Sequence, residues 1–196
     1  MQIVRPTMEH LESFIAALEA GWSPQSTRPD AAAETLAAVR ADPQSFLADQ
    51  FDPEGRRAPF RLPDGSLQPA IPEYRYWLWD GGFCGVVSLR WLPGTTALPE
   101  NILGHVGYTV VPWKRGRGYA TAAVRQILPV ARAEGLPFVD LTTDPGNRAS
   151  QAVILANGGV RVEAFTKSPA QGGGPALRFR IALDGPAGGT AVGVKG

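Results

Sequence analysis

Hydrophobic positions near the N-terminus recur at the spacing of amphipathic helices. After a short strand-like start, the first set follows Thr7, a good helix-capping residue, and stops before Gly21; its apolar members are Leu11, Phe14, Ile15 and Leu18. A second helix is predicted after Asp30 and a short third one from Pro43, because Asp caps helix N-termini and Pro favours the first helical position.

Residues 52–73 have a different composition. They contain five prolines and a Pro-Asp-Gly-Ser turn signal, which predict a long loop. Its three arginines, Arg56, Arg57 and Arg61, are expected to be solvated and without a functional role.

From residue 74 the pattern becomes that of β-strands separated by helices. YRYWLW, a turn at Asp80-Gly81-Gly82 and FCGVVSLRWL predict an antiparallel hairpin. The later elements are predicted as a strand at 102–111, a helix at 118–134, a strand at 138–143, a helix at 148–156, and strands at 160–165 and 176–183. A helix of this length is typical of a crossover, so strands 102–111 and 138–143 are expected to be parallel. The predicted fold is therefore mixed α/β, a central mixed sheet with an antiparallel meander, one parallel pair, and helices on both faces.

Composition narrows the classes of function. The 196 residues suit one domain, expected over 1–183, followed by a flexible Gly- and Ala-rich tail at 184–196. A net charge of +1 gives no field that would gather a nucleic acid, and no apolar run approaches the length of a membrane span. Cys84 is the only cysteine, so we expect a cytoplasmic protein with no intrachain disulfide and no cysteine-bound metal cluster. We expect it to be a monomer or homodimer.

The most informative segment is a glycine-rich basic turn between a strand and a helix, PWKRGRGYAT. Unpaired N–H groups and the positive end of the helix dipole favour a phosphate or pyrophosphate there. Gly116 and Gly118 would let the backbone approach the anion, and Thr121 adds a hydroxyl. A solvated connector is the alternative interpretation of this pattern alone. The turn has neither the Gly-Lys-Ser/Thr ending of a P-loop nor the third glycine of a dinucleotide fingerprint.

Read as Arg115-x-x-Gly118-x-Ala120, the turn resembles the acyl-CoA signature of the GNAT superfamily of N-acetyltransferases. Asn147-Arg148-Ala149-Ser150 and Asn157-Gly158-Gly159 resemble the N-x-x-S and N-G-[FG] stretches of the same superfamily, and GHVGYTVVP resembles its central strand. The resemblance covers roughly residues 74–183. It is nearest to the uncharacterised "predicted acetyltransferase" branch, which has G-H-[IV]-G-Y and N-G-G.

The resemblance implies acetyl-CoA as cosubstrate and no metal. The central strand would splay from its neighbour, and its backbone at Tyr108, Thr109 and Val110 would pair with the pantetheine arm. The pyrophosphate would lie on the turn, whose candidate residues are Arg115, Gly116, Arg117, Gly118, Tyr119, Ala120 and Thr121. Asn147 would bind the pantetheine arm, although an Asn there also suits a helix N-cap.

Two residues are candidates for proton transfer. His105 lies where related sequences often carry a glutamate base, and a histidine titrates near neutrality; a structural role is the alternative. The tyrosine that many family members use as an acid is replaced here by Ile154. Ser150, one helical turn earlier, is the substitute candidate, with helix capping as its alternative role.

The resemblance thus predicts an acetyl-CoA-dependent N-acetyltransferase that transfers an acetyl group directly to a primary amine of a small molecule or protein. A non-catalytic acetyl-CoA-binding or sensing module is the alternative, because the usual acid is absent. The sequence does not identify the acceptor.

Overall fold

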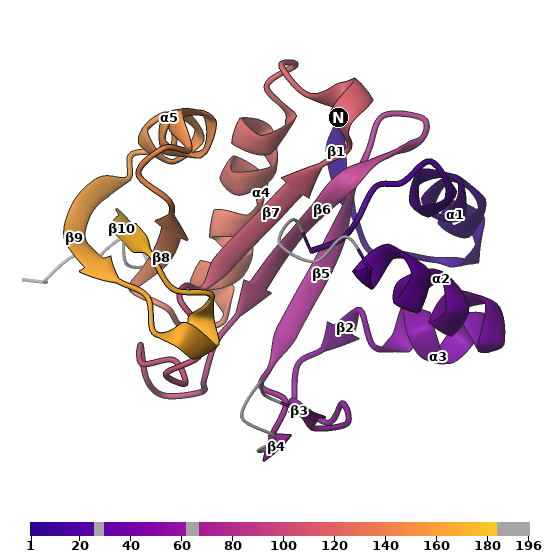
Figure 1. The fold of residues 1–196 in the computed structure, drawn as a ribbon, viewed down its shortest axis with the longest axis horizontal. Helices are drawn as coiled ribbons and strands as arrows, with labels where there is room; N and C mark the ends of the chain where they lie inside the picture. Colours follow the sequence, from indigo (N-terminus) through magenta and orange to yellow (C-terminus); the bar gives the residue numbers. More distant parts are fainter. Residues whose placement is uncertain (26–29, 62–66, 184–196) are drawn as a thin grey trace, which may run out of the picture.

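The computed structural model describes residues 1–25, 30–61 and 67–183 (Figure 1). The predicted tail at 184–196 lies outside these residues. The helical elements are η1 (Met8–His10), α1 (Leu11–Glu19), α2 (Ala31–Ala41), α3 (Pro43–Ala48), η2 (Pro112–Lys114), α4 (Tyr119–Ala133), α5 (Arg148–Leu155) and η3 (Pro169–Gln171). The strands are β1 (Gln2–Val4), β2 (Phe51–Asp52), β3 (Phe60–Arg61), β4 (Leu67–Gln68), β5 (Glu73–Trp79), β6 (Phe83–Arg90), β7 (Val106–Val110), β8 (Phe138–Thr143), β9 (Val160–Thr166) and β10 (Pro175–Ala182).

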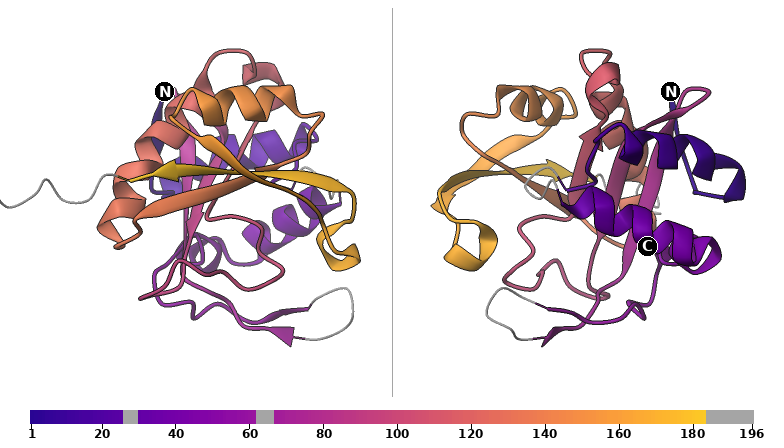
Figure 2. Two further views of the ribbon diagram at one scale, coloured as in Figure 1. Left: turned by 90° about the vertical axis from the view of Figure 1, so that its left-hand side faces the viewer. Right: turned by 45° about the vertical axis from the view of Figure 1, so that its right-hand side comes forward.

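The first sheet runs in the order β1-β5-β6-β7, and β2 also pairs with β5. All of its strand pairs are antiparallel, and β5 and β6 form the predicted hairpin. A second antiparallel sheet, in the order β8-β10-β9, holds the C-terminal strands. Helices α1 to α3 and the second sheet lie at opposite ends of the molecule in Figures 1 and 2.

Helices cover both faces of the first sheet, so the predicted α/β fold class is confirmed. The expected parallel pair does not form as a hydrogen-bonded ladder: strands 106–110 and 138–143 belong to different sheets, and the described strand pairs of both sheets are antiparallel. On one face, Phe14 of α1 stacks on the fully buried Trp77 of β5, with ring centroids 4.2 Å apart. On the other, Val124 and Ile127 of α4 are fully buried among residues of β5, β6 and β7. Each of these side chains contributes about 1.5–3 kcal/mol by leaving water. The helical spacing in the sequence therefore marked the faces that are buried.

Strands β7 and β8 meet at only one end. His105, just before β7, donates its N–H to the carbonyl of Asp140 in β8 at 2.8 Å, yet the two strands belong to different sheets. Both run toward the same end of the molecule in Figure 1 and diverge as they do so. The strand predicted at 102–111 is correspondingly shorter, and β7 begins at Val106. The carbonyl of His105 still accepts the N–H of Arg90 in β6, at 2.9 Å, whereas its N–H has turned to β8. Residues of both strands line an opening between the two sheets.

The segment predicted as a long loop is partly ordered by one carboxylate. Asp52 accepts the backbone N–H groups of Arg56 and Arg57, both at 2.9 Å, and also contacts the Arg57 side chain. The expectation that these arginines are merely solvated is wrong for Arg57, whose side chain is only 16% exposed. The side chain of Arg56 is solvated as expected, being 79% exposed.

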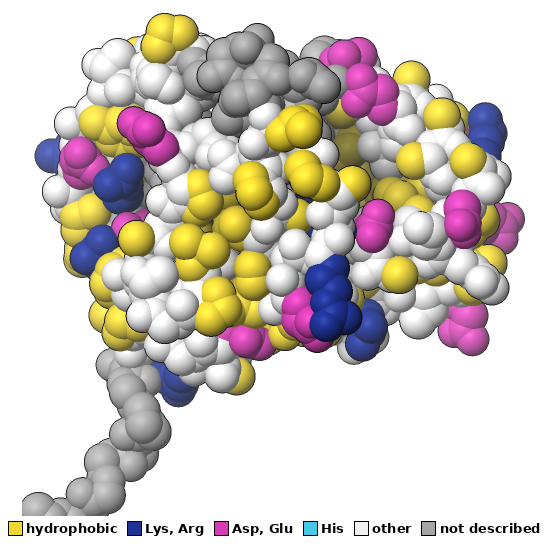
Figure 3. Space-filling model, turned by 90° about the horizontal axis from the view of Figure 1, so that it is seen from below, with side chains coloured by type: hydrophobic (Ala, Val, Ile, Leu, Met, Phe, Trp, Pro, Cys, Tyr) yellow, Lys and Arg dark blue, Asp and Glu magenta, His cyan; other side chains and the backbone are white. Residues whose placement is uncertain are grey.

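The described surface mixes side chains of different kinds. On the face drawn in Figure 3, acidic and basic side chains are interspersed with hydrophobic ones. In the described part of the chain, no helix is long and apolar enough to cross a membrane. Nor do the described residues contain a group of His, Cys, Asp and Glu side chains suited to a metal ion.

Candidate active site

The glycine turn joins the end of β7 to the start of α4. Gly116 and Gly118 have φ of +73° and +75°, a region that other residues adopt only with strain, and Gly118 is the N-cap of α4. No heavy atom lies within 4 Å of where a Cβ would stand at either position. The turn is therefore an open concavity of backbone at the positive end of a 15-residue helix, an arrangement suited to anions.

Neighbouring side chains hold this turn in place. Asp80, in the β5–β6 turn, accepts from Lys114 Nζ at 2.7 and 2.8 Å and from the Tyr119 hydroxyl at 2.6 Å. These hydrogen bonds hold the pKa of Asp80 well below its usual range, so the carboxylate is charged. Arg115 Nε donates to the carbonyl of Val110 at 3.1 Å. The turn is thus anchored to β7 and to the neighbouring hairpin.

One edge of β7 is open. Val111 donates its N–H to the carbonyl of Cys84 at 3.0 Å, which points the peptide groups of residue 111 toward β6. In an antiparallel strand these directions alternate, so the groups of Thr109 also face β6, whereas those of Tyr108 and Val110 face away from it. Because β7 is the last strand of its sheet, the peptide groups of Tyr108 and Val110 border the opening toward β8.

Helix α5 forms the opposite wall. Asn147 caps it by accepting the N–H of Ser150 at 3.0 Å. The Ser150 hydroxyl lies 2.8 Å from the phenol oxygen of Tyr108, across the opening. Burial raises the pKa of Tyr108, partly offset by this hydrogen bond, so the phenol is protonated at neutral pH. The two hydroxyls form a pair that can donate a proton into the opening.

These walls enclose one groove with a volume of about 840 Å³, within the range of ligand sites. Its lining includes eleven of the residues singled out in the sequence: Tyr108, Thr109, Val110, Arg115, Gly116, Gly118, Tyr119, Ala120, Thr121, Asn147 and Ser150. Arg117 and His105 are not among the lining residues.

The family model described as the acetyltransferase (GNAT) domain matches residues 25–160. The chain belongs to the GNAT acetyltransferase family. None of the curated proteins matches it.

Solved structures share the fold of this GNAT protein at low sequence identity. A ribosomal L7/L12 α-N-protein acetyltransferase, RimL, in complex with coenzyme A has a TM-score of 0.60 and 13% identity, with 94% of each chain covered. The microcin C7 self-immunity acetyltransferase MccE, in complex with acetyl-CoA and AMP, has a TM-score of 0.58 and 10% identity, with 92% of this chain and 91% of that chain covered. RimJ from Mycobacterium smegmatis, in complex with CoA-disulfide, has a TM-score of 0.53 and 16% identity, with 92% of this chain and 80% of that chain covered.

Within this GNAT domain, the geometry does not support His105 as the base. Its side chain is 1% exposed, and Nδ1 accepts the N–H of Asp140 at 3.0 Å, so the ring proton must be on Nε2. Burial is the main cause that lowers the pKa of His105, and the imidazole is neutral. A ring that is enclosed and already bonded through Nδ1 cannot take a proton from an amine in the groove. His105 instead joins β7 to β8 where the two strands begin to diverge.

The residue at the usual tyrosine position is part of the core of this GNAT domain. Ile154 is 1% exposed, and a Cβ at Gly159 would lie 2.4 Å from its Cγ2 and 2.9 Å from its carbonyl oxygen. The glycine is thus required by close packing against α5, which gives the N-G-G stretch a structural reason.

Two features of the groove escaped the sequence reasoning. Tyr108 was singled out for its backbone, but its phenol also reaches Ser150 of α5. Arg90, at the end of β6, lines the same groove and was not considered. Period-two alternation in β6 and β7 could have assigned each side chain to a sheet face, but not to a partner 42 residues away.

Proposed function

We propose that this protein is an N-acetyltransferase that moves the acetyl group of acetyl-CoA to a primary amine. The observation that carries this proposal is the continuity of the open β7 edge with the glycine turn in one groove. An extended pantetheine arm needs a free strand edge, and a pyrophosphate needs exposed amides at a helix start. The RimL and MccE structures, which share the fold, contain coenzyme A and acetyl-CoA respectively.

In this proposal the cosubstrate lies along both features. The amides of residues 115–120 and the Thr121 hydroxyl bind the pyrophosphate, including the amide of Arg117, which needs no side chain in the groove. The peptide groups of Tyr108 bind the pantetheine arm as a neighbouring strand would. Val110, whose carbonyl already accepts from Arg115 Nε, offers its N–H to the thioester carbonyl of the same ligand. Asn147 has its side-chain oxygen committed to capping α5, so we assign the pantetheine contact to its amide nitrogen, a donor.

We propose direct transfer without an acylated enzyme. The neutral amine attacks the thioester carbonyl carbon, forming the C–N bond, and the negative charge on oxygen is stabilised by the N–H of Val110. Collapse breaks the C–S bond and releases coenzyme A as a thiolate, while the new amide loses one proton to solvent. Because His105 is enclosed, the amine enters already neutral, and the rate follows the deprotonation of the acceptor.

Ser150 remains the proposed proton donor to the thiolate, now acting together with Tyr108. The hydroxyls are 2.8 Å apart, so a proton given by one is replaced from the other. His105 is reassigned from base to positioning residue, because it touches the backbone of β8 and not the groove.

We place this activity in one domain, residues 1–183, acting in the cytoplasm as a monomer or homodimer. The test mixes the purified full chain with acetyl-CoA and a panel of primary amines, and follows thiol release and acetylated product by mass. Release of thiol that depends on an amine, with matching product, supports the proposal. Acetyl-CoA binding without turnover on any amine would instead identify a sensing module, and no binding at all would refute the assignment of the groove.

A further inference from the structure

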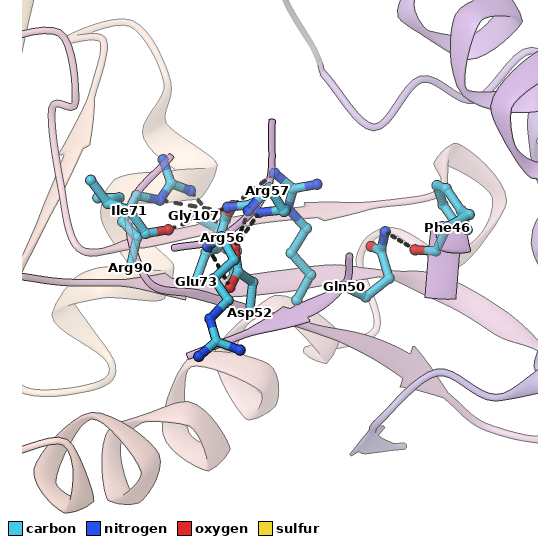
Figure 4. Close-up of polar contacts among 11 residues, drawn as sticks. Phe46, Gln50, Asp52, Arg56, Arg57, Ile71, Glu73, Arg90 and Gly107 are labelled. Carbon is cyan, nitrogen blue, oxygen red and sulfur yellow. Dashed lines mark hydrogen bonds and ion pairs between the residues drawn. The ribbon is translucent and has the colours of Figure 1, made fainter. Parts of the chain in front are cut away.

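A cluster of charged side chains lies on the face of the first sheet that bears α1, where β5 begins and β6 ends (Figure 4). We call it the Glu73 cluster; its members are Asp52, Arg57, Glu73, Arg75 and Arg90. Glu73 is the centre, since its Oε2 accepts from Arg57 and Arg75 at 2.7 Å each. Figure 4 shows the side chains of Arg57, Asp52 and Glu73 converging, with Arg90 and Gly107 beside them.

The cluster has an excess of positive charge. It contains three guanidinium groups and two carboxylates. Although burial opposes ionisation, Arg75, Arg90 and Arg57 lower the pKa of Glu73 to about 2, so the carboxylate is charged at neutral pH. The lowered pKa of Asp52, which accepts two backbone N–H groups and the Arg57 side chain, has the same consequence. One positive charge therefore has no counterpart inside the cluster.

Arg90 is the member of the cluster whose guanidinium charge is least compensated by hydrogen bonds and carboxylates. Its Nε is buried without a hydrogen-bond partner, because the nearest carboxylate oxygen, Oε1 of Glu73, is 3.7 Å away. Among the described residues, the one hydrogen bond of its side chain is from Nη2 to the Ser88 hydroxyl, at 2.7 Å. By contrast, Arg57 bonds to both carboxylates of the cluster. Leaving charged donors this incompletely partnered is costly unless another group binds them.

Arg90 is also the member that reaches the groove. Its side chain is 28% exposed, and it lines the groove together with Tyr108 and Val110. Gly107 makes room for it: a Cβ there would lie 2.9 Å from Arg90 Nη2. Along β7, Gly107 precedes the peptide groups of Tyr108 and Val110 by one and three residues, roughly 3–10 Å of strand. The guanidinium is thus on the side of the proposed reaction point away from the glycine turn.

We propose that Arg90 binds a carboxylate of the acceptor, so that the acceptor is an amine that also carries a carboxylate. This inference rests on the proposed acetyl transfer. A guanidinium can bind a carboxylate through two parallel hydrogen bonds, which fixes orientation as well as position. The span between Gly107 and Val110 is roughly 10 Å. After a hydrogen bond of about 3 Å at each end, it leaves about 4 Å, which suits the separation of an amine and a carboxylate within one amino acid or within two adjacent residues of a peptide. Binding there supplies the missing negative charge and holds the amine beside the thioester carbon.

The experiment compares matched acceptors with the full-length protein. The first arm uses free amino acids against the same amino acids as carboxamides. The second uses amidated peptides with Asp or Glu as second residue against the same peptides with Asn or Gln. We expect kcat/KM to favour the carboxylate form by about 10- to 100-fold, mostly through KM, in the first arm for a small-molecule acceptor and in the second for a peptide acceptor.

Variants connect that preference to Arg90. Arg90→Gln should remove it while leaving the acetyl-CoA Kd unchanged, and Arg90→Lys should retain part of it, because the charge stays but the paired donors are lost. Arg56→Gln is the matched control, since the Arg56 side chain is 79% exposed and its ion pair within the described part of the chain is with Glu54. If Arg90→Gln does not fold, the inference is still tested by the carboxylate preference of the wild type and by its reduction in Arg90→Lys.

Equal use of carboxylate and carboxamide forms by the wild type would overturn the inference and leave the acetyl transfer intact. So would a preference that persists in a folded Arg90→Gln variant. A protein that binds acetyl-CoA but acetylates no amine of any charge would overturn the proposed function, and this inference with it.

Discussion

The turn before α4 offers a substitution whose effects on stability and on binding separate. Gly118 has φ +75°, and a Cβ there meets no heavy atom within 4 Å. Gly118→Ala therefore introduces no clash in the free protein and costs only the strain of a left-handed alanine, about 1 kcal/mol. For a chain of this size that corresponds to a fall in Tm of roughly 2–4 °C. The new methyl group, however, occupies the space in which the pyrophosphate approaches the backbone.

Gly135 provides a matched control at the other end of the same helix. It follows α4, has φ +82°, and its added Cβ also meets nothing within 4 Å. Gly135→Ala should lower the free energy of unfolding by the same amount, about 1 kcal/mol, without affecting the groove.

Calorimetric titration of acetyl-CoA, with thermal unfolding of both variants, tests this pair of effects. We expect Gly118→Ala to weaken binding by about 10- to 100-fold, the size of one lost charge-assisted hydrogen bond, and Gly135→Ala to bind as the wild type does. If the two folded variants bind acetyl-CoA equally well, the pyrophosphate does not lie on this turn.

Three further outcomes follow from the charged and polar groups. The pKa of His105 is lowered, so the stability linked to it is present above pH 6.5 and is lost as the pH falls below that value; His105→Asn should lack this step in urea unfolding measured from pH 7.5 to 5. The pKa of Glu73 is about 2, so its contribution to the free energy of unfolding is present above pH 4.5 and is lost as the pH falls toward 2. Glu73→Gln should lower the free energy of unfolding by about 3 kcal/mol at pH 7, because it leaves guanidinium groups without a negative charge beside them. A loss under about 1 kcal/mol would contradict the charge balance described. Ser150→Ala and Tyr108→Phe should each lower kcat roughly 10²-fold at unchanged acetyl-CoA Kd, and the double variant should be no slower; additive effects in steady-state kinetics would show that the hydroxyls do not act as a pair.

Local patterns predicted the elements because local interactions determine them. The spacing that includes Phe14 marks the face of α1 that is buried, and the glycines of residues 116–118 mark a left-handed turn at a helix start. The order of strands and helices then left few possible topologies. A groove beside β7 was accordingly expected from the resemblance. The structure brings eleven of the predicted residues together there, but not Arg117 or His105.

Long-range pairing was not accessible in this way. The bond of Arg57 to Glu73 spans 16 residues and a proline-rich stretch, and neither residue stands out in a periodic pattern. His105 has the chemistry of a base, but its role depends on whether its ring faces the groove or the strand beside it. Here Nδ1 is occupied by the peptide N–H of Asp140, a contact set by how two sheets meet. Residue type indicates what chemistry is possible, and burial decides whether a substrate can reach it.

The contacts of Asp80 determine how the glycine turn behaves when it is empty. One carboxylate, fixed in a hairpin turn, holds Lys114 just before the glycines and Tyr119 just after them. The turn between these two points has little conformational freedom left to lose, so a ligand that binds there spends little of its affinity on ordering the backbone. The positive charge of Lys114 is at the same time neutralised within the protein, whereas Arg115, which also lines the groove, donates to a neutral carbonyl and keeps its full charge. Such a site combines amides of fixed direction with a positive charge, so it favours an anion whose oxygens fit both.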